Sequence, residues 1–135
     1  LIGIGPTGTE ATVDELVRVG DIHPRVDKFR HLHNQYIDNM ARYGVFGLVG
    51  FLVLLLVPFA LFLAKTRSGL PSVRALGLAG VLFVGLHGVV NLTQSMLERN
   101  IGVMMFVFVV VFLWAALKRE ERIADKSDAP VTAVD

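Results

Sequence analysis

The chain has 135 residues, of which 53% are hydrophobic and only 19% are charged. A soluble domain of ordinary composition is less apolar and carries more charge. Because the excess of apolar residues is concentrated in three blocks, the sequence predicts an integral membrane protein. The formal net charge of +1 gives no reason to expect nucleic acid as a partner, and the absence of cysteine excludes disulfide bonds, thiolate metal sites and a thiol nucleophile.

Residues 1–9 form a glycine-rich loop in which Gly3, Gly5 and Gly8 match the spacing of a dinucleotide-binding fingerprint. That fingerprint requires a preceding strand, for which the two residues before Gly3 leave no room. Pro6 also interrupts the loop, so the stretch predicts a backbone turn. Since neither an initiator methionine nor a signal peptide is visible, we expect the chain to be cut from a longer polypeptide.

Residues 10–19 have the pattern of a short amphipathic helix that ends at Gly20. Pro24 disfavours helical geometry at His23, so a turn is expected there. A second helix is then predicted from Pro24 or Arg25 onward. We expect this helix to carry the polar residues that follow and to continue without a break into the first apolar block.

Three apolar segments, at about 44–64, 75–97 and 101–117, are predicted to cross the membrane, because roughly 20 apolar residues span its hydrocarbon core. Pro58 should kink the first of them without breaking it. The predicted fold class is all-α: a polytopic membrane protein fragment with three transmembrane helices after a short helical periplasmic segment. Residues 1–42 would end a periplasmic loop, and residues 118–135 would form a polar, disordered cytoplasmic tail.

Basic residues predict the orientation of these spans. Lys65, Arg67 and Arg74 flank the first loop, and a second basic group follows the third span, whereas Arg99 stands alone in the opposite turn. The positive-inside rule places both basic groups in the cytoplasm. The second group consists of Lys118, Arg119 and Arg122. With three spans, residues 1–42 and the imidazole of His33 then lie on the outer side.

The polar residues around His33 are the first candidates for chemistry. An imidazole titrates near neutral pH and can act as a general base, although His33 can equally be a surface histidine near the headgroups. Asn34 has the groups to bind a sugar or phosphate oxygen, or to cap a helix. Arg30 suits a bidentate phosphate contact, or it is a solvated charge. His31 and His33 would point to different faces of a helix, so we predict no metal site and no cofactor.

The predicted second span itself carries a second set of polar residues. His87, Asn91 and Ser95 are four residues apart and would line one helical face, which Glu98 extends. Polar groups at membrane depth usually face a bundle interior or a wet cavity. Two interpretations stand side by side: a wet pocket that opens outward, and interhelical hydrogen bonds that hold the bundle together. His87, near mid-membrane, is expected to be a packed neutral histidine.

The spacing of His33 and Asn34, nine further residues, Gly44, two residues and Gly47 resembles the signature of the O-antigen ligase family. This family belongs to a superfamily that includes O-antigen polymerases and bacterial O-oligosaccharyltransferases. In the family pattern, Asn, Ser or Gln follows the histidine. The resemblance covers the chain as the C-terminal portion of such an enzyme, and glycines at the positions of Gly44 and Gly47 belong to the motif.

The resemblance implies a glycosyltransferase of the bacterial inner membrane. It would transfer O-antigen polysaccharide from undecaprenyl pyrophosphate to lipid A-core at the periplasmic face, without a metal or other cofactor. His33 would be the catalytic histidine, and Arg30, Asn34 and Arg99 are candidate substrate-binding residues. The arginines with which the family binds pyrophosphate would lie upstream of this chain, and neither Arg30 nor Arg99 matches one of their positions. Further transmembrane helices upstream in the same polypeptide, and the lipid bilayer, would be its partners. The fragment by itself is expected to be inactive.

Two alternatives remain open at the level of sequence. A polymerase of the same superfamily would share the motif but use a growing glycan as acceptor. A non-catalytic membrane module would use its histidines for structure or for metal binding. Neither alternative involves nucleic acid.

Overall fold

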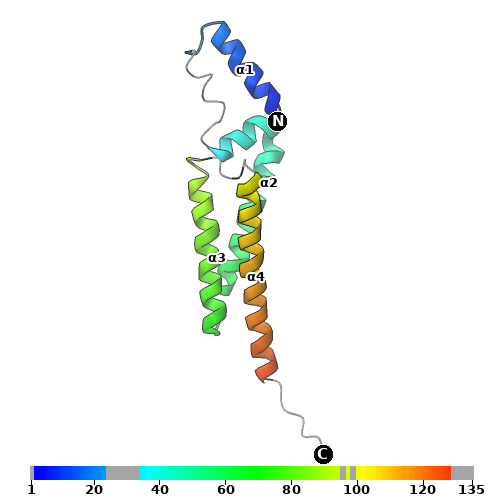
Figure 1. Ribbon diagram of the computed structural model, residues 1–135, viewed down its shortest axis with the longest axis vertical. Coiled ribbons are helices and arrows are strands. Elements are labelled where there is room, and N and C mark those ends of the chain that lie inside the picture. Colours follow the sequence, from blue (N-terminus) through cyan, green and yellow to red (C-terminus); the bar gives the residue numbers. More distant parts are fainter. Residues whose placement is uncertain (1, 24–33, 95–96, 98–99, 129–135) are drawn as a thin grey trace, which may run out of the picture.

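The computed structural model describes residues 2–23, 34–94, 97 and 100–128. Within these ranges the chain forms four helices and no strand: α1 (Pro6–Arg18), α2 (Gln35–Lys65), α3 (Pro71–Val90) and α4 (Asn100–Asp128). The predicted all-α class is therefore confirmed (Figure 1). The helix predicted from Pro24 or Arg25 lies largely outside the described residues.

Three of these helices are long and apolar enough to cross a membrane: Gln35–Lys65, Pro71–Val90 and Ile101–Ser127. Their outward faces carry large apolar side chains such as Phe46, Leu82 and Phe112, which are more than half exposed. In water such surfaces would be costly, whereas lipid tails or further helices cover them without penalty. The three helices therefore identify a multi-pass, membrane-embedded chain.

The helix boundaries differ from those expected from sequence. The second span ends at Val90, well before Leu97, because the Asn91 side-chain amide donates to the carbonyl of His87 (2.7 Å) while Asn91 itself caps the helix. The third continues to Asp128, where a disordered tail was expected. Residues after Leu117 are mostly strong helix formers, and Lys118 pairs with Glu121 one turn later, which explains the continuation.

Helix α3 packs against both α2 and α4. Two small residues on α3 let α2 approach closely: Gly80 lies directly against the ring of Phe62, and Gly77 lies against the backbone of Lys65 and Thr66. Phe62 is fully buried and makes an edge-on contact with Trp114 of α4 (ring centroids 5.8 Å apart). This aromatic pair thus connects α2 to α4.

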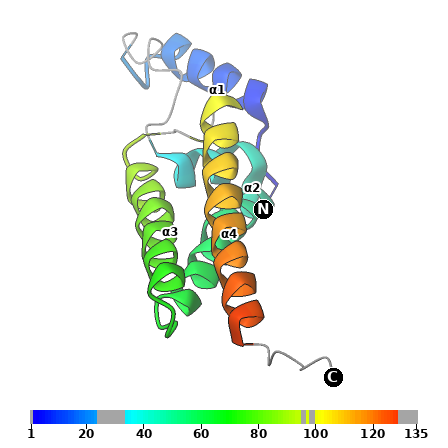
Figure 2. The same ribbon diagram turned by 60° about the horizontal axis from the view of Figure 1, so that its bottom comes forward.

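The two ends of the bundle differ in character. At one end Lys65 of α2 pairs with Glu121 of α4 (2.5 Å), and Lys118 pairs with the same carboxylate (2.8 Å). This contact brings both groups of basic residues to one end, as the predicted spans require. Helix α1 lies at the other end, which Figure 1 and Figure 2 show from two directions.

Replacing Gly80 with alanine should destabilise the bundle, because the new Cβ would overlap the buried ring of Phe62. We expect the free energy of unfolding in detergent to fall by about 1–3 kcal/mol. Gly85→Ala is the matched control, since a Cβ there meets only Phe59 at an ordinary 3.6 Å. Equal stability of the two variants, measured by denaturant titration, would contradict this packing.

Candidate functional site

Helix α2 is interrupted at Gly44, near the end of the bundle that faces α1. Gly44 has φ 68° and ψ −159°, a backbone region that is essentially restricted to glycine. Gly47 has no room for a Cβ, which would collide with the Cβ of Tyr43 and lie 3.0 Å from the carbonyl oxygen of Asn39. The two glycines therefore permit a sharp bend, and residues 35–43 turn across the end of the bundle (Figure 1).

The N-terminal glycine-rich loop docks at this break. An interrupted helix leaves carbonyls in the preceding turn without intrahelical donors. Here the carbonyl of Ala41 accepts from the N–H of Ile4 (3.0 Å), and that of Arg42 accepts from the N–H of Gly5 (2.9 Å). Gly3 lies so close to the Arg42–Tyr43 backbone that a Cβ would not fit. Residues 2–5 precede α1 as an irregular loop, and Gly3 serves this close approach. Residues 6–9, which were also expected in the loop, instead begin α1.

Residues 35–43, which we call the folded-back segment, are held in place by hydrogen bonds and a ring contact. The side chain of Asn34 caps it, accepting from the N–H groups of Tyr36 (3.0 Å) and Ile37 (3.1 Å). The Tyr36 hydroxyl donates to the carbonyl of Gly88 on α3 (2.9 Å), and its ring meets Phe51 edge-on at 4.9 Å. The N–H of Gln35 donates to the carbonyl of Asn91 (2.9 Å). Residues from α2 and α3 that are distant in sequence therefore meet here.

Polar side chains gather where the segment meets the end of α3. We call Gln35, Asp38, Asn39, Arg42 and Asn91 the polar cluster. Four of them are buried, with exposed fractions between 0% for Asn91 and 8% for Asn39. Asp38 accepts from Nε of Arg42 (2.8 Å), so the buried carboxylate has a cationic partner. Asp38 also lies in the first turn of α2, where the helix dipole favours negative charge.

Two buried acceptors in the polar cluster have no donor among the described residues. They are Oε1 of Gln35 and Oδ1 of Asn91. The nitrogens of the same amides are occupied: Gln35 donates to Asn39 (3.4 Å), and Asn91 donates to His87. A buried acceptor without a donor costs about 1–3 kcal/mol. Each of these oxygens therefore needs a donor from outside the described residues, and a water molecule is small enough to supply it.

His87 is packed as the sequence suggested. Its ring lies between Phe83 and Phe106, at centroid distances of 4.4 and 5.1 Å. Nδ1 is 2.9 Å from the carbonyl oxygen of Phe83, which can only accept, so Nδ1 carries the hydrogen. The ring is thus held by its own helix and by α4. The backbone carbonyl of His87 accepts a hydrogen bond from the side-chain amide of Asn91, so His87 is connected to the polar cluster.

The predicted site residues fall into two groups. Asn34, Gly44 and Gly47 are described, and each has a structural task as cap, break and close-approach position. His33, Arg30 and Arg99 lie outside the described residues, as do His31, Ser95 and Glu98. Sequence reasoning missed Gln35, Asp38 and Asn39. Their signal was a set of polar residues three to four positions apart on one helical face.

Replacing Asn34 with alanine should destabilise the folded-back segment, because two N–H groups lose their acceptor. We expect a loss of about 1 kcal/mol in the free energy of unfolding. Asn34→Ser keeps an oxygen acceptor and should retain most of that stability. Thermal denaturation in detergent measures both, and indistinguishable variants would exclude a capping role.

Replacing Gly44 with alanine should strain the break, since φ 68° with ψ −159° is poorly accessible to other residues. The expected cost is about 1–3 kcal/mol. Gly50→Ala in the same helix has open space around its Cβ and serves as the control. Greater resistance of the Gly44 variant to denaturation would show that α2 is continuous.

Comparison with known proteins identifies one distant relative. The chain is 22% identical over 102 residues to an uncharacterized protein of Haemophilus influenzae, a match that covers 76% of this chain and 26% of the relative. The chain thus spans about a quarter of that protein's length. No family model matches the chain, and no solved structure gives a significant match.

Proposed function

We propose that this chain is the C-terminal part of a glycosyltransferase of the O-antigen ligase type. The enzyme would transfer O-antigen polysaccharide from undecaprenyl pyrophosphate to lipid A-core, at the periplasmic face of the bacterial inner membrane. The helices described here would form one end of a longer membrane domain. A relative of which this chain covers 26% supports that part of the proposal.

The observation that carries the proposal is the position of the motif beside the polar cluster. Within that cluster, the buried carbonyl oxygens of Gln35 and Asn91 have no donor among the described residues. The two residues are joined by the Gln35 N–H bond to the Asn91 carbonyl, and Gln35 directly follows the capping residue Asn34. The acceptors therefore lie beside the motif that resembles the ligase signature.

The structural tasks of the motif also support the proposal. Asn34 caps the folded-back segment, and asparagine and serine, two of the residues that the family pattern allows at this position, are strong helix caps. Gly44 and Gly47 make the bend that brings this segment across the bundle end. The four motif positions would thus work together: three shape the segment, and His33 precedes it in sequence.

The chemistry assigns a role to each candidate residue. The acceptor hydroxyl loses its proton to the imidazole of His33 as its oxygen bonds to the anomeric carbon of the donor. The bond between that carbon and the pyrophosphate oxygen breaks, and the leaving pyrophosphate takes up the negative charge. Arginines upstream of this chain would stabilise that charge, and Arg30 or Arg99 would contribute to it. Asn34 would contribute by positioning the segment.

The distribution of charge supports the proposed orientation. Lys65, Lys118 and Glu121 meet at one end of the bundle, and the polar cluster lies at the other. The positive-inside rule assigns the basic end to the cytoplasm. The polar cluster would then face the periplasm, where lipid-linked polysaccharide and lipid A-core are both accessible.

Replacing His33 with alanine in the complete protein should reduce polysaccharide-capped lipopolysaccharide by roughly 10²–10⁴-fold, the usual contribution of a general base. Electrophoresis of lipopolysaccharide from cells that express the variant measures capping. His23→Ala is a matched control, since His23 lies on an exposed stretch before α2. Immunoblots of both variants establish equal abundance in the membrane.

The amount of capping and the length of the glycan chains together distinguish the three candidate functions. Loss of capping with glycan chains of normal length supports a ligase. Shortened chains with intact capping would identify a polymerase of the same superfamily and overturn the assignment to a ligase. Undiminished capping and normal chain length would identify a non-catalytic module.

A further inference from the structure

The last part of α4 separates its charges onto two faces. At about 100° per residue, Lys118, Arg119, Arg122 and Lys126 fall within roughly one quadrant of the helix. Glu120, Glu121 and Asp125 project from the remaining surface. The segment has no large net charge, so its composition hides this asymmetry. The helical period places these four cations on one side of α4, which we call the basic face.

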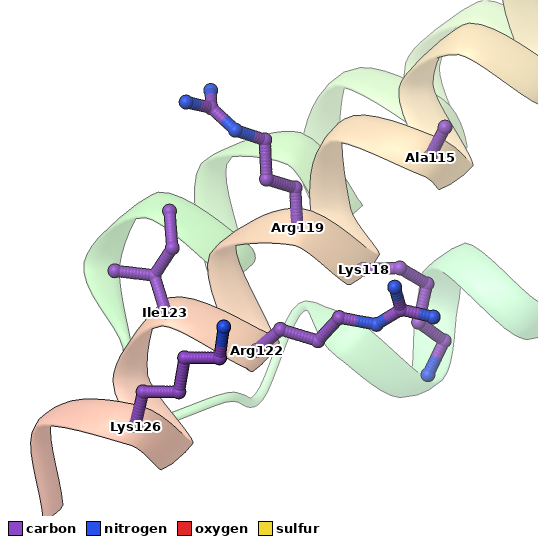
Figure 3. Close-up of a pocket in the computed structure, with 6 residues that line it drawn as sticks. All are labelled: Ala115, Lys118, Arg119, Arg122, Ile123 and Lys126. Carbon is purple, nitrogen blue, oxygen red and sulfur yellow. The ribbon is translucent and has the colours of Figure 1, made fainter.

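Glu121, one of these three acidic residues, is already paired. Both carboxylate oxygens of Glu121 are used, one by Lys65 of α2 (2.5 Å) and the other by Lys118 (2.8 Å). In the described part of the chain, Arg119, Arg122 and Lys126 have no acidic partner, and all three are exposed. Together with Lys118, Ala115 and Ile123 they line a hollow of about 380 Å³ (Figure 3).

The hollow lies at the depth of lipid headgroups. Trp114 lies one turn before Lys118, and Nζ of Lys118 is 5.1 Å from the centre of the indole ring. Tryptophan prefers the boundary between hydrocarbon and headgroups. At 1.5 Å per residue, Lys118 and Arg122 then stand about 6 and 12 Å beyond that boundary. Flexible side chains at these heights reach the phosphate layer.

We propose that this basic face of α4 binds the phosphate groups of anionic phospholipids in the leaflet at the basic end of the bundle. Arginine pairs bidentately with phosphate oxygens, and two of the four cations are arginines. Ala115 and Ile123 give the hollow apolar walls against which the glycerol region of a lipid packs. A lipid is the proposed occupant because the hollow directly follows the apolar part of α4, one of the three helices that are long and apolar enough to cross a membrane.

Titration of the full chain in phosphatidylcholine nanodiscs with phosphatidylglycerol tests the proposal, with bound lipids counted by native mass spectrometry. Arg119→Gln/Arg122→Gln should weaken phosphatidylglycerol binding by roughly 10- to 30-fold, at about 1 kcal/mol for each basic residue near the surface. Arg67→Gln/Arg74→Gln removes the same number of exposed arginines at the same end and should leave most of the binding.

Equal losses in the two double variants would show a general effect of net charge and overturn the site on α4. Unchanged binding in the Arg119/Arg122 variant would also overturn it. Displacement of phosphatidylglycerol by inorganic phosphate would identify a site for soluble anions instead of lipid. Circular dichroism of each variant confirms that α4 remains helical.

Discussion

A break in a helix leaves backbone carbonyls without donors, and next to a membrane such groups need partners from the protein itself. At the Gly44 break, these partners come from a segment that lies far earlier in the chain. Ile4 and Gly5 donate to the carbonyls of Ala41 and Arg42. Once that contact exists, residues 35–43 are fixed across the bundle end, and the geometry of the polar cluster follows.

The same contact explains why so many polar groups can be buried at one end of an apolar bundle. Asp38 pairs with Arg42, Tyr36 donates to Gly88, and Gln35 bonds to Asn91 across two helices. These bonds satisfy most of the buried groups and hold the segment rigidly. The amide oxygens of Gln35 and Asn91 are the exceptions within the described residues.

At the opposite end of the bundle, ion pairs connect the helices. Glu121 joins α2 to α4 through Lys65 and Lys118, and this engagement leaves the other cations of α4 facing away from the bundle. One end therefore gathers buried polar groups, whereas the other gathers exposed cations. This division agrees with a chain that has different chemistry on the two sides of a membrane.

The sequence alone determined the all-α class and the three membrane-crossing segments, because length and apolar composition control the cost of placing a helix in lipid. It also predicted the packed ring of His87. The break at Gly44 within a continuous helical pattern, the early end of α3 and the burial of Gln35, Asp38 and Asn39 were decided by tertiary structure. Periodicity records which face a residue occupies, but contacts between Ile4 and Ala41, or between Gln35 and Asn91, depend on how distant segments meet in space.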